Sequence, residues 1–191
     1  MRLLQFLALA TLSLTLASPL LAQEEAIGVP GPIDFEGTSF ELAWTSHPTD
    51  TYYKQEYVPE GQVVDAYAEM FMVDVITAGQ TPQQAVAGFT AELDKRKATD
   101  LLVNYSVLEN PETGEMLFDF LLSDSSSGTL IVEWNAYRYT PLGDGLSLFA
   151  ISRRGYGEDG AKSFLAQLPD WRQSSINALA ELELPEISLQ D

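Results

Sequence analysis

Between residues 101 and 151 the chain alternates apolar and polar residues in four runs, and this alternation limits the folds that it can adopt. Sequences rich in Gly, Pro, Asn, Asp and Ser separate the runs at residues 110–114, 124–128 and 141–145. A period of two residues is typical of β-strands, and short turns of this composition join neighbouring antiparallel strands. The sequence therefore predicts a four-stranded meander, and apolar residues on both faces indicate that both sides of its sheet are covered.

The first half of the chain predicts three more strands, near residues 40–44, 51–58 and 70–76, with a turn at residues 45–50 between the first two. The first run alternates, the second is rich in tyrosine, and the third is almost continuously apolar. A continuous apolar run of this length is typical of a strand buried on both faces. Three strands are therefore expected before the first helix.

The clearest local signal is a helix start at Thr81. Its hydroxyl is suited to accept a hydrogen bond from a free backbone N–H, Pro82 suits the first helical position, and Gln84 completes a capping box. We expect a helix from Thr81 to about Lys97, where basic side chains favour the helix C-terminus. A second helical region is expected over about residues 159–183.

The expected element order is three strands, a helix, a four-stranded meander and a second helix. Helices packed on a mostly antiparallel sheet form an α+β domain. We assign this single domain to residues 39–183, after a flexible leader at residues 23–38 and before an acidic tail at residues 184–191. A domain of this length has room for a sizeable core.

This order of elements resembles the PsbP-like fold family, which includes periplasmic DcrB-type proteins. The resemblance rests on the strand at residues 51–59, on the capped helix start at Thr81 and Pro82, and on the hairpins around residues 110–114 and 141–145. It implies a PsbP-like sheet and a small accessory or binding domain rather than an enzyme. No family motif carries a functional residue over to this chain.

Residues 1–22 have the composition of a secretory signal peptide. Arg2 supplies a positive charge, residues 3–16 form a leucine-rich apolar run, and Ala22 before Gln23 marks a cleavage site. The apolar run is shorter than the roughly 20 residues that span a membrane. We therefore expect an exported protein, periplasmic or secreted at a bacterial envelope, without stable insertion in the membrane.

The formal net charge is −18, from 28 acidic and 10 basic side chains. Such a charge opposes binding to nucleic acid and to anionic membrane surfaces, because both repel it. It suits a basic partner or a cation, but we favour the simpler interpretation that the charge keeps an exported protein soluble.

The chain has no cysteine and one histidine, His47. Thiol catalysis, thiolate metal sites and ordinary zinc sites are therefore excluded by inventory. His47 stands beside Pro48 in the predicted turn, where we expect an exposed loop residue rather than a general base. The oxygen-rich turns lack the spacing of a calcium loop, and no phosphate-binding glycine motif is present. We therefore expect no metal and no cofactor.

Asp119 is the carboxylate that most invites a catalytic interpretation, because it stands between Leu117 and Leu121 in an apolar strand. Burial would raise its pKa and suit it to act as an acid in a hydrolase that uses paired carboxylates. The alternative is structural: its face of the strand is solvated, or Arg138 pairs with it across the sheet. We favour the structural alternative.

Aromatic and basic residues gather on two predicted neighbouring strands. Trp134, Tyr137 and Arg138 lie on one strand, and Arg153 and Arg154 lie on the other. Arginine and aromatic side chains concentrate binding energy, so these residues form a candidate site for an anionic ligand or a partner. The alternative is ordinary cross-strand pairing that stabilises the sheet.

The sequence favours an exported, non-catalytic accessory or binding protein whose partner is a protein or a small molecule. Two alternatives stay open. The first is a carboxylate-dependent hydrolase with Asp119 as the residue to test. The second is a carrier that holds a small apolar ligand between the sheet and a helix.

Overall fold

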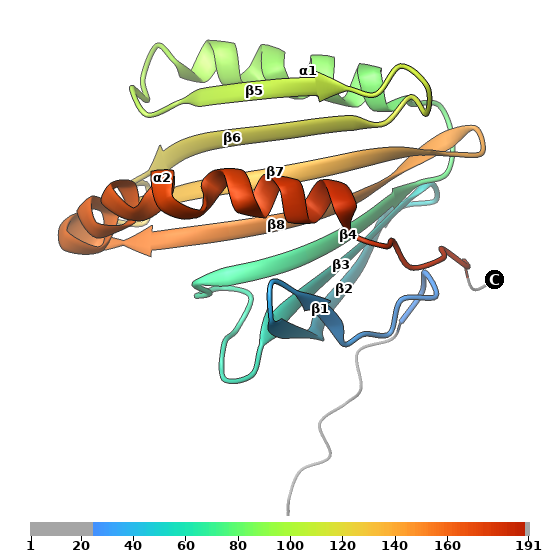
Figure 1. Cartoon of the computed structure of the whole chain (residues 1–191), viewed down its shortest axis with the longest axis horizontal. Coiled ribbons are helices and arrows are strands. Elements are labelled where there is room, and N and C mark those ends of the chain that lie inside the picture. The colour runs from blue at the N-terminus through green and yellow to red at the C-terminus, as the bar shows by residue number, and fades with distance from the viewer. Residues whose placement is uncertain (1–24, 190–191) are drawn as a thin grey trace, which may run out of the picture.

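The computed structural model describes residues 25–189 (Figure 1). The strands of this part of the chain form one antiparallel sheet of eight, in the spatial order β1-β2-β3-β4-β8-β7-β6-β5. In chain order the elements are β1 (Ile33–Phe35), β2 (Thr38–Thr49), β3 (Tyr52–Pro59), β4 (Glu69–Ile76), α1 (Pro82–Arg96), β5 (Asn104–Glu109), β6 (Met116–Asp124), β7 (Ile131–Leu142), β8 (Gly145–Tyr156) and α2 (Gly157–Glu181).

The sheet consists of two four-stranded meanders that meet at its centre. Strands β1–β4 form one meander, strands β5–β8 form the other, and β4 pairs with β8 from Glu69↔Arg153 to Ile76↔Leu146. Helix α1 carries the chain from the central strand β4 to β5 at the edge of the sheet (Figure 1). Because β4 and β8 have neighbours on both sides and cover on both faces, most of their residues are buried.

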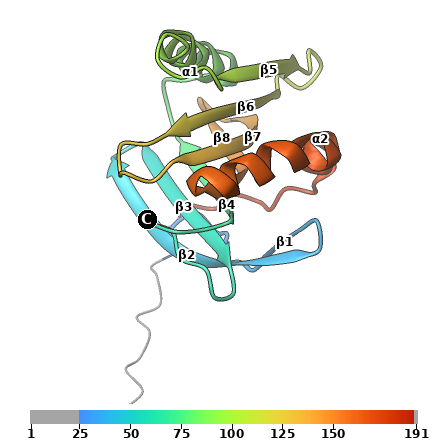
Figure 2. The same ribbon diagram turned by 90° about the vertical axis from the view of Figure 1, so that its left-hand side faces the viewer.

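The expected layout of three strands, a helix, four strands and a helix on a PsbP-like sheet is wrong. A further strand, β1, pairs with β2 through a tight turn at Glu36 and Gly37, both of which have positive φ. Ile33 and Phe35 are buried and flank Asp34, but three residues are too short a run to show a period. The twisted strands also curl around α2: in Figure 2, β5 and β6 lie above the helix and β1 lies below it.

The first described residues belong to the core. Ile27 and Val29 are buried, and β1 lies within the segment that the sequence assigns to a leader. The side-chain amide of Gln55 donates to the carbonyl oxygen of Val29 at 3.0 Å, and the hydroxyl of Tyr57 donates to the same oxygen. The backbone N–H of Ser188 donates to the carbonyl oxygen of Ile27 at 2.8 Å, so the two ends of the described chain lie side by side.

Strand β2 continues through the turn expected at residues 45–50, and the turn prediction is wrong for residues 45–49. The pairing of β2 with β3 shifts register between Leu42 and Trp44 and again between Ser46 and Thr49. Irregularities of this bulge kind interrupt the alternation of side chains. The sequence therefore shows no clean strand period where the strand is in fact continuous.

The two helices pack on opposite faces of the sheet. Leu168, Ile176 and Leu179 of α2 belong to one core cluster, and Val86 and Leu93 of α1 belong to another. We name these faces the α2 face and the α1 face. The sheet residues that define the α2 face include Phe71, Trp134 and Ile151, and those that define the α1 face include Met72, Phe118 and Leu148.

Helix α1 begins where the sequence predicts. The hydroxyl oxygen of Thr81 accepts a hydrogen bond from the N–H of Gln84 at 3.2 Å, and the side-chain oxygen of Gln84 accepts one from the N–H of Thr81 at 2.9 Å. These two bonds confirm the capping box. Lys95 and Arg96 lie in the last turn, where the helix dipole favours positive charge.

The structure bears on the membrane prediction but not on the signal peptide. Residues 1–22 and the predicted cleavage site at Ala22 and Gln23 lie outside the described residues. Within residues 25–189, neither helix combines the length and the apolar character that crossing a membrane requires.

Candidate functional site

A pocket of about 480 Å³ lies between α1 and the sheet, on the α1 face. Three strands of the sheet supply its polar and aromatic wall. Strand β3 contributes Tyr52 and Lys54, β4 contributes Asp74, and β7 contributes Tyr137 and Tyr139. Pockets that bind small molecules have volumes of roughly 300–1,000 Å³, and this one falls in that range.

The sheet register places these side chains in one row. Lys54 pairs with Asp74, Asp74 pairs with Leu148, and Leu148 pairs with Tyr139. Paired residues in an antiparallel sheet point to the same face, so four strands present one side chain each to the pocket. Lys54 and Tyr139, which lie 85 positions apart in the sequence, therefore stand at the two ends of one row that crosses four strands.

Asp74 has one partnered and one unpartnered oxygen. The hydroxyl of Tyr52 donates to its Oδ2 at 2.7 Å, whereas its Oδ1 is buried and accepts no hydrogen bond. Burial raises the pKa of Asp74 to about 6, although the charge of Lys54 and the hydrogen bond from Tyr52 act in the opposite direction. The pocket thus holds a carboxyl group that ionises close to neutral pH and has a free acceptor atom.

The other charged group of this wall, Lys54, is bound elsewhere. Its ammonium lies 2.8 Å from Oε1 of Glu56. Burial lowers the pKa of Lys54, but the hydrogen bond to Glu56 and the charge of Asp74 outweigh burial and hold that pKa above its usual value. Burial and the Asp74 carboxylate likewise raise the pKa of the Tyr52 phenol, which keeps its proton and remains the donor.

Helix α1 forms the opposite wall with Ala85, Gly88 and Phe89. The ring of Phe89 meets the ring of Tyr137 edge to face, with centroids 5.9 Å apart. A Cβ atom on Gly88 would meet no atom within 4 Å, so packing does not require a glycine there. Glycine inside a helix costs about 1 kcal/mol relative to alanine, and at this position it leaves the pocket wall without a side chain.

The structure divides the predicted binding residues between the two faces. Trp134, Arg138 and Arg153 lie on the α2 face, whereas Tyr137 and Arg154 lie on the α1 face. Consecutive residues of a strand point in opposite directions, so neighbours in sequence such as Tyr137 and Arg138 are separated by the sheet. Of the five, Tyr137 lines the pocket.

Arg138 caps the C-terminal end of helix α2. Its guanidinium donates to the carbonyl oxygens of Leu179 and Leu182 at 3.2 and 2.9 Å, and to the carboxylate of Glu115 at 3.1 Å. Helix α2 has no basic residue in its own last turn. A cation near these carbonyl groups satisfies them and favours the negative end of the helix dipole.

Arg153 is surrounded by partners on the α2 face. Its guanidinium lies 2.7 Å from Glu36 and 3.2 Å from Glu69, donates to the hydroxyl of Ser175, and lies 4.8 Å from the centre of the Trp171 ring. These contacts join the turn between β1 and β2 to β4, β8 and α2. The two carboxylates and the Trp171 ring thus already bind the guanidinium of Arg153.

Arg154 lies on the α1 face, outside the lining of the α1-face pocket. It forms an ion pair with Glu133 at 2.6 Å and lies 4.1 Å from the centre of the Tyr67 ring. Trp134 is fully buried on the other face, where its ring meets that of Trp171. Both residues are therefore in contact with well-packed neighbours.

Asp119 is buried on the α2 face and paired with a residue that the sequence does not suggest. Its Oδ2 accepts hydrogen bonds from both Nε and a terminal nitrogen of Arg172 on α2. Arg138, the expected partner, binds Glu115 instead. His47 is exposed and stacks on the ring of Tyr53, with centroids 3.9 Å apart.

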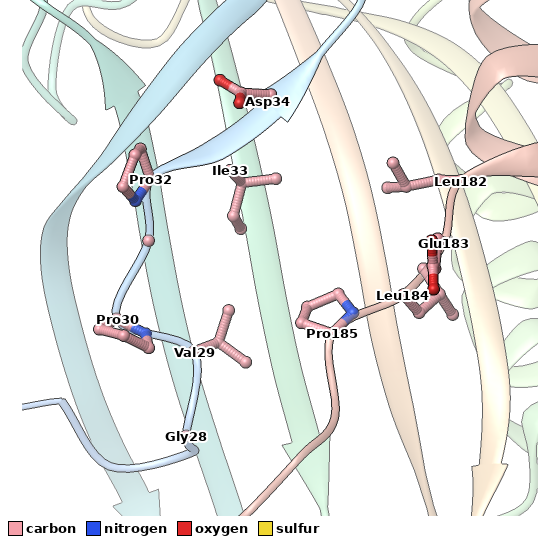
Figure 3. A pocket seen from close by; sticks show the side chains of 11 residues that line it. Gly28, Val29, Pro30, Pro32, Ile33, Asp34, Leu182, Glu183, Leu184 and Pro185 are labelled. Atoms are coloured by element: carbon pink, nitrogen blue, oxygen red, sulfur yellow. The ribbon is translucent and has the colours of Figure 1, made fainter.

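A second hollow of about 460 Å³ lies between the two ends of the described chain (Figure 3). Pro30, Pro32 and Ile33 face Leu182 and Pro185 across it. Within the described residues, no buried side-chain atom without a hydrogen-bond partner belongs to its lining. The hollow thus lacks the free polar group that distinguishes the α1-face pocket.

Sequence reasoning missed the residues of the pocket itself. Asp74 is the one charged residue in the apolar run at residues 70–76, a pattern like that of Asp119 and equally visible in the sequence. Lys54 stands in a strand rich in tyrosine, which is also visible in the sequence. Gly88 and Phe89 carry no such signal, because their role depends on where α1 lies over the sheet.

Among the described residues, no three His, Asp or Glu side chains are grouped to hold a metal ion.

The chain belongs to an uncharacterised protein family, whose model matches residues 27–184. The match spans both meanders and both helices, so the pocket lies within the family domain. No curated protein and no solved structure matches the chain. These comparisons give no support to the PsbP-like or DcrB-type resemblance.

Proposed function

We propose that the protein is an exported, non-catalytic binding protein that holds a small molecule between α1 and the sheet. One observation carries this proposal: Oδ1 of Asp74 is buried without a hydrogen-bond partner in a pocket of ligand-binding size. Export to the periplasm or beyond is supported by the signal-peptide pattern of residues 1–22.

An unpartnered buried acceptor is costly for a folded protein. Leaving one without a hydrogen bond costs about 1–3 kcal/mol. By contrast, the carboxylates of Asp119, Glu36 and Glu133 all accept hydrogen bonds from arginines. An oxygen without a partner, on a residue that lines a pocket, is suited to a group from outside the chain.

The mixed lining indicates a ligand with an apolar body and a polar group. Phe89, Leu146 and Leu148 offer apolar surface, and Asp74 offers the acceptor. The pocket lies between the sheet and a helix, which is where the carrier alternative would hold its ligand. We do not favour the hydrolase alternative, because the side chain of Asp119 binds Arg172 on the other face of the sheet.

The position of Gly88 provides the test. Gly88→Phe places a ring at the pocket wall without displacing neighbouring atoms at Cβ, whereas Gly88→Ala adds only a methyl group. We would screen a panel of small aromatic and aliphatic fragments, charged and uncharged, by amide chemical-shift mapping of the protein. Hits should shift resonances of α1, β3 and β4, bind the alanine variant as they bind the parent, and fail to bind the phenylalanine variant.

Circular dichroism and the dispersion of the amide spectrum would establish that both variants are folded. The proposal is wrong if the hits bind the phenylalanine variant as tightly as the parent. It is equally wrong if no member of the panel shifts resonances around the pocket.

A further inference from the structure

The free atom of the pocket is an acceptor, and this limits what binds it. An ionised carboxylate accepts hydrogen bonds and donates none, so the group that meets Oδ1 of Asp74 must be a donor. Lys54 is the cross-strand neighbour of Asp74, yet no hydrogen bond joins them and its ammonium lies 2.8 Å from Glu56. The donor is therefore expected from a ligand.

Aromatic rings line the same space. Tyr52 and Tyr139 contribute rings from the sheet, and Phe89 contributes one from α1. The face of an aromatic ring carries negative charge and attracts cations within about 6 Å of its centre. A pocket that combines a carboxylate with several rings favours a donor that is also positively charged.

The surrounding charges act in the same direction. Lys54 forms its ion pair with Glu56, and its charge also acts on Asp74, so the three groups together carry one net negative charge when Asp74 is ionised. The chain as a whole carries a net charge of −18, which draws cations toward it and repels anions. An anionic ligand would meet both the local and the overall charge unfavourably.

We propose that the occupant of this pocket is an organic cation, a protonated amine with an apolar body whose N–H donates to Oδ1 of Asp74. This inference rests on the proposed function and specifies its ligand class. Tyr52 holds Oδ2 of Asp74 and so leaves Oδ1 as the acceptor without a partner. Phe89 and the tyrosine rings surround the apolar body and the charge.

The test uses three probes of similar size and different charge: benzylamine, benzyl alcohol and phenylacetate. At pH 8 each is titrated into the protein while amide chemical shifts around the pocket are followed. Benzylamine should bind about tenfold or more tightly than benzyl alcohol, because only the amine is cationic. Phenylacetate should bind more weakly than either.

Two variants and a control connect this preference to the pocket. Asp74→Asn should weaken benzylamine binding about tenfold or more and change benzyl alcohol binding by less than about twofold, because it removes charge at nearly constant shape. Phe89→Leu should weaken benzylamine more than benzyl alcohol, because it replaces a ring with an aliphatic group. Asp65→Asn removes one charge from an exposed residue and should leave both affinities unchanged.

The inference is overturned if benzyl alcohol or phenylacetate binds as tightly as benzylamine, or if Asp74→Asn leaves benzylamine binding intact. If other fragments bind the pocket under these conditions, the ligand class is wrong and the proposed function stands. If no fragment and none of the three probes binds there, the proposed function itself is wrong.

Discussion

At the scale of single residues, burial moves the ionisation of Asp74 toward neutral pH. Its pKa is about 6 in the folded chain, against roughly 3.9 for an aspartate in an unfolded one. The folded state therefore holds the proton more tightly than the unfolded state, and ionisation of Asp74 opposes folding. Stability contributed by the neutral form is lost as pH rises from about 4 to 6, by about 3 kcal/mol in all.

We predict that Asp74→Asn stabilises the protein at pH 7.5 by about 1–2 kcal/mol, because an amide needs no proton to be neutral. The variant should also lose most of the change in stability that the parent shows between pH 4 and 6. Urea denaturation at a series of pH values measures both effects. A variant that is less stable than the parent at pH 7.5 would show instead that the carboxylate supports the fold.

We also predict that benzylamine binding weakens as pH falls below about 6. Alkylammonium groups stay protonated throughout this range, so the change reports on Asp74. Well below the pKa the affinity should fall about tenfold for each pH unit, since neutral Asp74 no longer attracts a cation. Titrations at pH 8, 6 and 5 test this, with Asp74→Asn as the variant that should show no such dependence. Equal affinities for the parent at all three values would contradict the prediction.

At the scale of elements, α1 contains a glycine that lowers the stability of the helix and leaves the pocket wall without a side chain. Gly88 is inside the helix, and a Cβ there would meet no other atom. We predict that Gly88→Ala raises the free energy of unfolding by about 0.5–1 kcal/mol, because alanine favours the helix and restricts the unfolded chain. Thermal denaturation measures the gain. A loss of stability would mean that the helix at this position needs the smaller residue.

Helix α2 depends on a residue of the sheet for its C-terminus. Replacing Arg138 with leucine leaves the carbonyl oxygens of Leu179 and Leu182, and the carboxylate of Glu115, without this donor. We expect a loss of about 2–3 kcal/mol in the free energy of unfolding. Arg138→Lys should recover part of it, because it restores the charge without the planar fork. If urea denaturation shows a loss below about 0.5 kcal/mol, the C-terminus of α2 does not depend on Arg138.

At the scale of the whole molecule, local patterns predicted local structure and failed where distant parts of the chain meet. The capping box at Thr81 placed α1, because a helix start depends on four neighbouring residues. The pairing of β4 with β8 depends on how α1 crosses the sheet, and no local period records it. The curl of the sheet depends on the same long-range assembly, whereas β1 forms a local hairpin with β2 and is too short to show a period.

The candidate site was hard to predict for the same reason. Alternation along a strand was visible, but reading Trp134, Tyr137 and Arg138 as one cluster neglected that adjacent residues point to opposite faces. The pocket needs the pairing of Lys54 with Asp74 and the position of Phe89 on the helix that forms the opposite wall. Register and helix placement are properties of the assembled sheet rather than of any segment.

A crystal structure of the protein grown with benzylamine at pH 8 would show whether an organic cation occupies the α1-face pocket. We expect density for the ligand between α1 and the sheet, with its nitrogen about 2.7–2.9 Å from Oδ1 of Asp74 and its ring against Phe89. A saturated crystal in which this pocket is empty, or in which the amine is turned away from Asp74, would overturn the proposed ligand class.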